Sequence, residues 1–535
     1  MVADTPEVEA VYLRESTKIE PLCCRWYAWA HVVAPLQQAL NVAFRQLPLL
    51  KSFIASPSVH EAASKDPRMM GGGFMNLKAS DVGAVRALMR EMKERCARLI
   101  KFAEDLVNFD RQVQASATGQ CLDHLYESLP QSLAGLIEIT YDLNSHPTLR
   151  LLEEFLYDDE LSTQATHELC FFQSKDEDRS FFLNTPRLDS PDRFMMRIPF
   201  SDPRLDLLAR ARIEPVCFAE LVRELAVSSE RTERFRQYFT GVPPIRRAPD
   251  YRGDDVRIRY FGHACVLIQT DQVSILIDPL FAWENDAERR RLIFNDLPDF
   301  IDYVFLTHNH HDHFSPEVFL QLRNRIGQIL VPRNNPNTVA DASMRLVLNH
   351  IGFSNVRVMD PLDTVAFSGG FLASLPFYGE HAGLSITSKH GMYLDIKGRK
   401  LAFLADSNCL DRIVYRRVAD RFGKADVLFI GMECQGAPLS WIYGPYLTNQ
   451  ISRKDDESRR SNGSDAEHAW ALREELGSQR VFVYAMGQEP WFRYHLDLIY
   501  TPESKQIVES EKFLHRCAQA RIPAVRLNGC TEFEL

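Results

Sequence analysis

The sequence of 535 residues contains no surplus of basic residues, no paired-cysteine motif and no long apolar run. Its formal net charge is -10, whereas a protein that binds nucleic acid normally carries a basic excess, so we expect no nucleic acid partner. No window approaches the roughly 18 uncharged apolar residues that a membrane helix requires, so we expect no membrane span. The acidic start, without a basic segment before an apolar one, predicts no signal peptide.

The 11 cysteines are scattered along the chain and include no C-x-x-C pair. Secreted domains that depend on disulfides carry an even and regularly spaced set of cysteines, and many structural zinc sites use C-x-x-C pairs. An odd and scattered set is typical of reduced thiols instead. We therefore expect a cytoplasmic protein.

The length exceeds what one ordinary hydrophobic core organises, so we expect at least two domains. Residues 241–253, GVPPIRRAPDYRG, combine proline, glycine and charge without periodicity and form the predicted linker. The linker divides the chain into a mixed α+β domain over residues 1–245 and a second domain over residues 246–535. In the first domain, apolar residues at three- and four-residue steps predict a helix from Ser80 to Phe109. Short strands are predicted at RLLEEFLY, ELCFFQ, RSFFLN and FMMRIPF, between residues 149 and 200.

The second domain alternates strand-like apolar runs with helical segments, which predicts an α/β fold. The predicted strands include VRIRYF, CVLIQT, VSILIDP, YVFLTH, QILVP, VRVMD, MYLDIKGRKLAFLAD, DVLFIGME and RVFVYAM. Helices are predicted at Ser315–Arg325 and Asp465–Leu476. The long polar segment 443–465 is open to two interpretations, a disordered surface loop or a mobile lid over a site.

One predicted strand, YVFL, opens directly into THNHHDHF, which brings His308, His310, Asp312 and His313 together. Neutral imidazoles and carboxylates are ligands that first-row divalent metals prefer. Four such groups converging in an interior would be destabilising without a metal, because each would need another polar partner. The alternative, a histidine-rich surface turn, fits this dense spacing poorly. The motif therefore predicts a site for two neighbouring metal ions.

The motif H-x-H-x-D-H resembles the signature of the metallo-β-lactamase superfamily. Upstream, FGHACVLIQTDQVSILIDPL resembles the opening hairpin of that fold and places Asp278 in a supporting position behind the metal loop. Downstream, RKLAFLADSN resembles the strand that delivers a metal-bridging aspartate, here Asp406. The resemblance implies a C-terminal αββα sandwich.

The chain departs from the hydrolases of this superfamily in two places. Where a hydrolase supplies a histidine, LPFYGEHAG offers both Glu380 and His381. Where it supplies the last histidine, RVFVYAMGQEPW offers none, and the nearest replacement is Glu433, as a ligand or as a carboxylate of the pocket. If Glu380 and Glu433 are ligands, the site is rich in carboxylates, which stabilise oxidised iron, whereas zinc usually keeps nitrogen-rich sites. On that condition the predicted metal is iron.

With these departures the chain resembles a narrower family, the CmlA-type diiron β-hydroxylases of chloramphenicol biosynthesis. The resemblance covers nearly the whole chain and includes PLLKSFIASPSVHEAASKDPR near the N-terminus and GEHAG in the site. It implies that Glu380 is a metal ligand and that His381 only supports the site. The implied arrangement places His308, His310 and Glu380 on one iron and Asp312, His313 and, as an open alternative, Glu433 on the other, with Asp406 between them.

The resemblance also implies an activity, O2-dependent β-hydroxylation of an amino acid, typically aromatic. The amino acid would be held as a thioester on the carrier domain of a nonribosomal peptide synthetase, and a reductase would act as the external electron donor. The N-terminal domain is expected to serve dimerisation and carrier docking, in a homodimer. The alternative is a dizinc hydrolase, a lactonase or phosphodiesterase, with a metal-bound hydroxide as nucleophile. A binding module with a relic site is a third possibility, which the intact H-x-H-x-D-H motif disfavours.

Several other residues carry weaker expectations. We expect His311, at a variable position of the motif, to point away from the metals. We expect His468 to be a surface or capping residue of a helix, with contact to the metals as the minor alternative. Aromatic residues near the expected pocket suit an aromatic substrate, although core packing is the better interpretation of each one taken singly: Phe377, Tyr378, Trp441, Tyr443, Tyr446 and Trp491.

Overall fold

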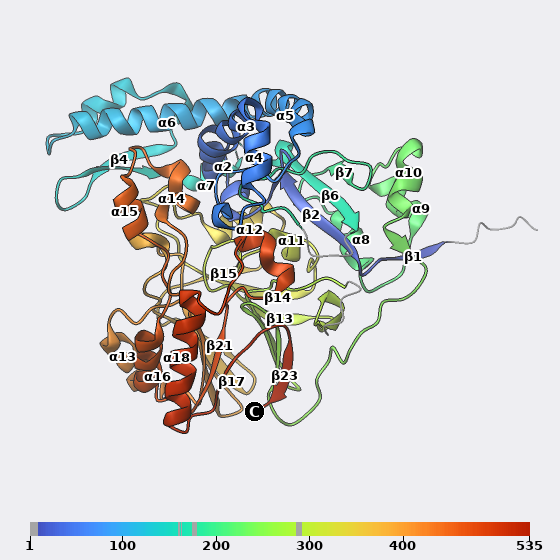
Figure 1. Cartoon of the computed structure of the whole chain (residues 1–535), viewed down its shortest axis with the longest axis vertical. Helices are drawn as coiled ribbons and strands as arrows, with labels where there is room; N and C mark the ends of the chain where they lie inside the picture. The colour runs from blue at the N-terminus through green and yellow to red at the C-terminus, as the bar shows by residue number, and fades with distance from the viewer. Residues whose placement is uncertain (1–8, 159–160, 162, 174–178, 285–290) are drawn as a thin grey trace, which may run out of the picture.

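The computed structural model describes residues 9–158, 161, 163–173, 179–284 and 291–535. A cap of helices and small sheets, built from the first part of the chain, lies over a two-sheet sandwich built from the second part (Figure 1). The chain passes from one to the other through residues 241–256, which form no regular helix or strand. Among the described residues, no helix combines the length and the apolar character that crossing a bilayer requires.

Two seven-stranded sheets form the sandwich in the part of the chain that the structure describes. The first sheet runs in the order β15 (Val356–Met359), β14 (Ile326–Pro332), β13 (Ile301–Phe305), β12 (Ser274–Ile277), β11 (Cys265–Gln269), β10 (Arg257–Gly262) and β23 (Thr531–Glu534). The second runs in the order β16 (Thr364–Phe367), β17 (Gly370–Leu375), β18 (Gly391–Ile396), β19 (Arg399–Phe403), β20 (Val427–Gly431), β21 (Arg480–Tyr484) and β22 (Ala524–Arg526).

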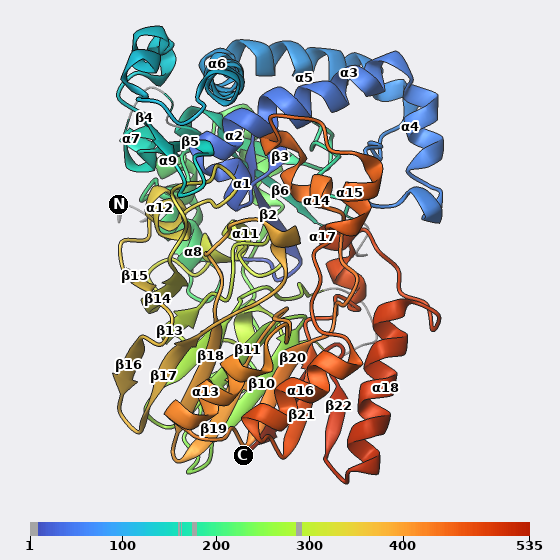
Figure 2. The same ribbon diagram turned by 90° about the vertical axis from the view of Figure 1, so that its left-hand side faces the viewer.

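The space between the sheets is filled by apolar side chains from both inner faces, such as Ile258, Val266, Phe403 and Phe429, all fully buried. The outer face of the second sheet is covered by α13 (Arg412–Phe422), α16 (Ala466–Leu476) and α18 (Lys505–Gln519) (Figure 2). The first sheet is covered by α11 (Pro316–Phe319), α12 (Met344–His350) and the cap. Two sheets between two helical layers make the expected αββα sandwich, and that prediction is confirmed.

The topology gathers several strand ends at one edge of the sandwich. Strands β12, β13 and β14 are parallel, and so are β19 and β20. The carboxyl ends of parallel strands meet at the same edge, which is where ligands bind in open α/β sheets. Asp278 follows β12, His308 follows β13, Asp406 follows β19 and Glu433 follows β20. This edge faces the cap, where the imidazole of His31 is hydrogen-bonded to the Tyr446 hydroxyl.

The cap contains a small antiparallel sheet and a helical layer. The sheet has the order β3 (Trp26–Tyr27), β2 (Thr17–Cys23), β6 (His167–Gln173) and β7 (Phe194–Arg197). The helical layer includes α2 (Pro35–Asn41), α3 (Leu47–Ala55), α5 (Val82–Arg95) and α6 (Ala97–Ser116), which lie together at the top of Figure 2. Smaller elements complete the cap, among them α9 (Phe218–Glu224), α10 (Ser229–Arg236) and the hairpin of β4 (Ile137–Tyr141) and β5 (Pro147–Leu151).

The single helix predicted from Ser80 to Phe109 is wrong, because the chain breaks at Cys96 into α5 and α6. Cys96 has φ −103° and ψ 16°, outside the helical region. Its side chain is fully buried, and its sulfur lies 3.5 Å from that of Cys24. The same apolar stripe continues through both helices, so periodicity alone could not reveal the break.

Two of the four strands predicted between residues 149 and 200 are confirmed, as β6 and β7. RLLEEFLY is wrong beyond Leu151, because α7 begins at Glu153. RSFFLN is not a strand either, because Phe181 and Phe182 fill space between the cap and the sandwich. The predicted helix Ser315–Arg325 is shortened to α11, whereas α16 is confirmed at its expected place.

The polar segment 443–465 is ordered and partly helical. It continues from α14 (Leu439–Tyr443) through a 3-10 turn, Gly444–Tyr446, to α15 (Arg453–Ser458). The Tyr446 hydroxyl accepts a hydrogen bond from Asn41 of the cap at 2.8 Å. The segment therefore joins the cap to the sandwich, which rules out the disordered loop.

Candidate metal centre

The loop that follows β13 is held from behind by Asp278. Its two carboxylate oxygens accept hydrogen bonds from the backbone N–H of Thr307 at 2.7 Å and from the Thr307 hydroxyl at 2.6 Å. Asp278 also lies 2.8 Å from Nδ1 of His313, and the Thr307 hydroxyl lies 3.0 Å from Nδ1 of His308. With Nδ1 engaged, each ring turns Nε2 inward, an arrangement typical of metal-binding histidines. The expected supporting position of Asp278 is confirmed.

The inward nitrogens of these two rings converge on Asp406. Nε2 of His313 lies 3.1 Å from Oδ2 of Asp406, and Nε2 of His308 lies 3.6 Å from the same oxygen. Both nitrogens and the other oxygen of Asp406 are buried without a hydrogen-bond partner among the described residues. Because buried polar atoms are rarely left unpaired, this group of two imidazole nitrogens and a carboxylate, all able to offer a lone pair, fits a metal ion well.

His310 faces the other side of the motif. Its Nδ1 lies 3.3 Å from Oε1 of Glu380, and its Nε2 is hydrogen-bonded to the Tyr443 hydroxyl at 2.9 Å. The ring of His381 stacks on that of His310 with 4.4 Å between centroids, and both of its nitrogens lack a hydrogen-bond partner in the described structure. The carboxylate of Glu380 thus faces the site, and His310, Glu380 and His381 form one group that could hold a metal ion.

The loop that presents Glu380 adopts an uncommon backbone conformation. Glu380 has φ 52° and ψ −168°, and Gly379, His381 and Ala382 also have positive φ. A non-glycine residue pays about 1–3 kcal/mol for such a conformation, which persists only where the surroundings impose it. Here the Lys389 side chain donates to the Gly379 carbonyl at 2.6 Å, and the backbone N–H of Glu380 donates to the Asn462 carbonyl at 3.3 Å.

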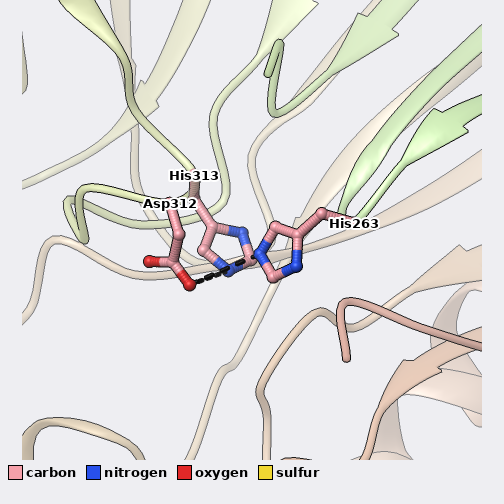
Figure 3. Close-up of side chains that lie close together, drawn as sticks. All are labelled: His263, Asp312 and His313. Atoms are coloured by element: carbon pink, nitrogen blue, oxygen red, sulfur yellow. Dashed lines mark ion pairs between the residues drawn. The ribbon is translucent and has the colours of Figure 1, made fainter. Parts of the chain in front are cut away.

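A third group contains a histidine that the sequence analysis missed. His263, in the turn between β10 and β11, places Nε2 3.3 Å from Oδ2 of Asp312, which is next to His313 (Figure 3). Its ring stacks on Phe492, and its backbone N–H donates to Glu489 at 2.9 Å. Glu489, in the segment where hydrolases supply their last histidine, therefore supports this turn. The signal that could have revealed His263 is its place in the Gly-His turn of the opening hairpin.

Burial and charge within the site favour bound cations. Burial and the neighbouring His313 hold the pKa of His308 well below its usual value, so this ring is neutral, the form that binds metal. Burial also opposes protonation of His313, but the carboxylates of Asp406, Asp312 and Asp278 outweigh it and raise its pKa well above the usual value. The pocket between these carboxylates is thus one in which positive charge is stabilised.

Three further residues considered from the sequence lie outside these groups. Glu433 accepts a hydrogen bond from the Tyr500 hydroxyl at 2.9 Å and belongs to none of the three candidate groups among the described residues. His311 turns Nε2 to the carbonyl of His495 at 3.0 Å, away from the groups, as expected. His468 is partly exposed on α16, 3.3 Å from Asp465, and its expected surface position is confirmed.

An open cavity of about 570 Å³ leads from the surface to these side chains. Its inner end is lined by His310, Asp312, Glu380, Asp406 and Glu433, and its walls and mouth by residues of both parts of the chain, including Met70, Gly71, Trp441, Leu496, Leu498, Ile499 and Tyr500. Of the aromatic residues considered in the sequence, Trp441 lines the cavity, Tyr443 holds His310 and Phe377 packs against His308.

The chain matches two protein families. Residues 12–243 match the model of the diiron non-heme beta-hydroxylase N-terminal domain, and residues 257–435 match that of a beta-lactamase superfamily domain. The chain is 32% identical over 523 residues to 4-amino-L-phenylalanyl-[CmlP-peptidyl-carrier-protein] 3-hydroxylase of Streptomyces venezuelae, across 96% of this chain and 98% of that protein.

Solved structures show the same relationship. The crystal structure of CmlA, a diiron beta-hydroxylase from Streptomyces venezuelae, superposes with a TM-score of 0.92 and 31% identity, across 99% of this chain and 100% of that chain. A mutant of the CmlA beta-hydroxylase gives a TM-score of 0.89, across 98% of this chain and 100% of that chain. Cap, sandwich and their order are therefore shared along the whole length, and this chain belongs to the CmlA-type family of diiron non-heme β-hydroxylases.

Proposed function

We propose that this enzyme hydroxylates the β-carbon of an aromatic amino acid held as a thioester on the carrier domain of a nonribosomal peptide synthetase. The observation that carries the proposal is the Glu380 carboxylate, which faces the site beside His310 where hydrolases of this fold supply a histidine. His308, His310 and Glu380 would hold one iron, and Asp312 and His313 the other, with Asp406 between them. Full-length similarity to a carrier-dependent hydroxylase supports the substrate class.

When bound, the iron pair supplies the activation of O2, with two electrons from an external donor such as a reductase. One oxygen atom enters the β-C–H bond as hydroxyl, and the other leaves as water with two protons. The protein's own residues position and enclose these reactants. Thr307 and Asp278 fix the orientation of two imidazoles, and Tyr443 fixes the third.

The cavity has a size and lining that suit an aminoacyl group delivered from outside by a carrier domain. Its volume of about 570 Å³ is that of a site for a small-molecule ligand. Trp441 and Leu496 give apolar walls for an aromatic side chain. Met70 and Gly71 of the cap join Leu498 and Ile499 of the sandwich around the opening, so we propose that the carrier docks across both parts. Family membership also leads us to propose a homodimer formed through the cap.

Metal analysis and product analysis together test the proposed function. The protein purified from medium that contains iron and zinc should hold two irons per chain and absorb in the near ultraviolet. With O2 and a reductant, the loaded carrier should gain the mass of one oxygen atom on its aminoacyl group. Two zinc ions with hydrolysis of the thioester or of a lactone would instead establish the hydrolase.

A further inference from the structure

The carboxylate of Glu433 differs from its neighbours at the inner end of the cavity. Asp312, Glu380 and Asp406 line the same end, and each belongs to a group of side chains that could hold a metal ion. Glu433 belongs to no such group among the described residues. It follows β20 in the chain, is partly exposed and lines the cavity.

Glu433 has one protein partner, and that partner is uncharged. Oε1 accepts the hydrogen bond from the Tyr500 hydroxyl, while Oε2 has no hydrogen-bond partner within the described structure. No lysine, arginine or histidine of the described residues pairs with it. Arg460 lines the same cavity, but it donates to the Gly436 carbonyl at 2.8 Å and pairs with Glu457.

A partly buried carboxylate without a cation is unfavourable, because it has lost part of its hydration and gained no opposite charge. Bound metals would neutralise Asp312, Glu380 and Asp406, but no candidate metal group includes Glu433. A cation that enters through the cavity could therefore bind Oε2 of Glu433 and neutralise its carboxylate. A substrate ammonium group is such a cation, with three N–H donors around a compact charge.

Resting on the proposed function, we propose that Glu433, oriented by Tyr500, binds the α-ammonium group of the aminoacyl substrate and does not ligate metal. The α-carbon that carries this ammonium is bonded to the β-carbon that is hydroxylated. An ammonium held at Glu433, next to Asp406 and Glu380 on the cavity wall, therefore fixes which carbon faces the metals. Glu433 is thus a binding residue that determines both substrate class and the position of hydroxylation.

Two unreactive probes isolate this contact. One is an L-phenylalanyl pantetheine analogue in which an amide replaces the thioester, and the other is its 3-phenylpropanoyl counterpart, which lacks only the α-amino group. Titration calorimetry of the iron-loaded full chain without O2 gives the ratio of their dissociation constants. The wild-type enzyme should prefer the amine by about tenfold or more, since a charge-assisted hydrogen bond is about twice as strong as a neutral one.

Glu433→Gln should reduce this preference to less than about threefold, because an amide cannot neutralise an ammonium. It should also retain two irons per chain. Tyr500→Phe should weaken the preference partly, since the carboxylate loses its orienting donor. Glu503→Gln is the matched control, because it removes the same charge from an exposed position near the start of α18 and should leave the ratio unchanged.

Three results would overturn the inference. These are loss of iron in Glu433→Gln, a preference that persists in that variant, and the absence of a preference in the wild-type enzyme, including the case in which neither probe binds. The probes are not turned over without O2, so the binding ratio does not depend on hydroxylation. A failure of the product analysis above would therefore leave this measurement interpretable, and the two proposals fail separately.

Discussion

At the scale of single residues, the chemistry depends on which of two neighbours, Glu380 or His381, completes the ligands beside His310. Both lie within reach, because consecutive residues of this loop have positive φ and turn successive side chains to the same side. Glu380 lines the cavity, whereas the ring of His381 stacks on His310. A carboxylate in this place adds negative charge that favours oxidised iron, and an imidazole would favour zinc.

Exchange of this carboxylate for an imidazole tests that argument. Glu380→His should raise the zinc-to-iron ratio of protein produced in medium with both metals, and should abolish hydroxylation. Glu380→Gln serves as the control, because it removes the carboxylate without adding a nitrogen ligand. Metal analysis of the two variants separates these effects, and hydroxylation retained in Glu380→His would refute the ligand assignment.

The hydroxyl of Tyr443 fixes the outward nitrogen of His310, and this contact also has a measurable effect. Loss of an outer partner of a metal-bound histidine typically lowers metal affinity by about 10- to 100-fold. Tyr443→Phe should therefore release iron to a chelator faster than the wild-type protein does. The matched control is Tyr446→Phe, since Tyr446 contacts His31 and Asn41. Equal release from both variants would show that Tyr443 does not position His310.

At this scale the sequence is informative where the residues are adjacent. The motif from His308 to His313 is local, so the grouping of its side chains could be predicted from spacing alone, and their binding of iron stays a prediction. His263 and Tyr500 come from segments far from the motif, and only the fold brings them to Asp312 and Glu433. Pairings of this kind leave no local pattern that a single sequence could reveal.

At the scale of elements, α7 carries a buried carboxyl group against the sandwich. Glu153 is only 6% exposed, and Asn334 donates to it at 3.4 Å. Burial is the main cause that raises the pKa of Glu153 from 4.5 to about 8, and Asp341 and Glu154 add to it against a backbone hydrogen bond from Ser343. At a pH between these two values, Glu153 is therefore protonated in the folded protein and ionised in the unfolded chain.

The sign of the pH dependence follows from this difference. Between pH 4.5 and about 8 the folded state binds more protons at Glu153 than the unfolded state does, so this group lowers stability as pH rises. Glu153→Gln should therefore be more stable than the wild-type protein by about 1–3 kcal/mol near pH 8 and nearly equal to it near pH 4.5. Urea unfolding at both pH values measures this, and a pH-independent difference would contradict the assignment.

Helices and strands were predictable where apolar residues recur with the period of one element and where no tertiary contact overrides that local pattern. The inner strands of the sandwich met that condition. The break at Cys96 and the irregular path of Phe181 and Phe182 did not. Phe182 packs 4.4 Å from the ring of His311, and Phe181 stacks on Trp441. Aromatic residues are common in strands, so this segment was predicted as one. Its two phenylalanines instead pack against residues of the other part of the chain.

At the scale of the whole molecule, the cap and the sandwich share one hydrophobic core. A single cluster extends from Trp29 and Phe53 of the cap to Val304 and Val347 of the sandwich. The division into at least two domains stays a prediction from length, whereas the αββα arrangement could be inferred from the resemblance. That the cap is fused to the metal site through a continuous core could not, because it depends on contacts between residues hundreds of positions apart.

A buried ion network crosses the same boundary. Arg179 pairs with Glu20 of β2 and, at 2.7 Å, with Glu317 of α11 in the sandwich. Its guanidinium lies 3.6 Å from the ring centroid of Tyr494, and Arg187 provides a second cation for Glu20. Glu317 forms no second ion pair among the described residues, although the Tyr27 hydroxyl donates to it at 2.9 Å and the charge of Arg212 acts on it from a longer distance. Arg179 is therefore the residue whose loss leaves a buried charge unpaired.

Arg179→Met should destabilise the protein by about 3–5 kcal/mol, the usual result of breaking a buried pair by removing one partner. Addition of Glu317→Gln in the same chain should restore part of the loss, because the stranded charge is then removed. Arg68→Met, which breaks an exposed pair with Asp66, should change stability by less than about 1 kcal/mol. Urea unfolding followed by hydrogen exchange should also show the cap opening before the sandwich in Arg179→Met alone. If the network does not join the two parts, Arg179→Met will behave as the surface control does, and cap and sandwich will exchange together.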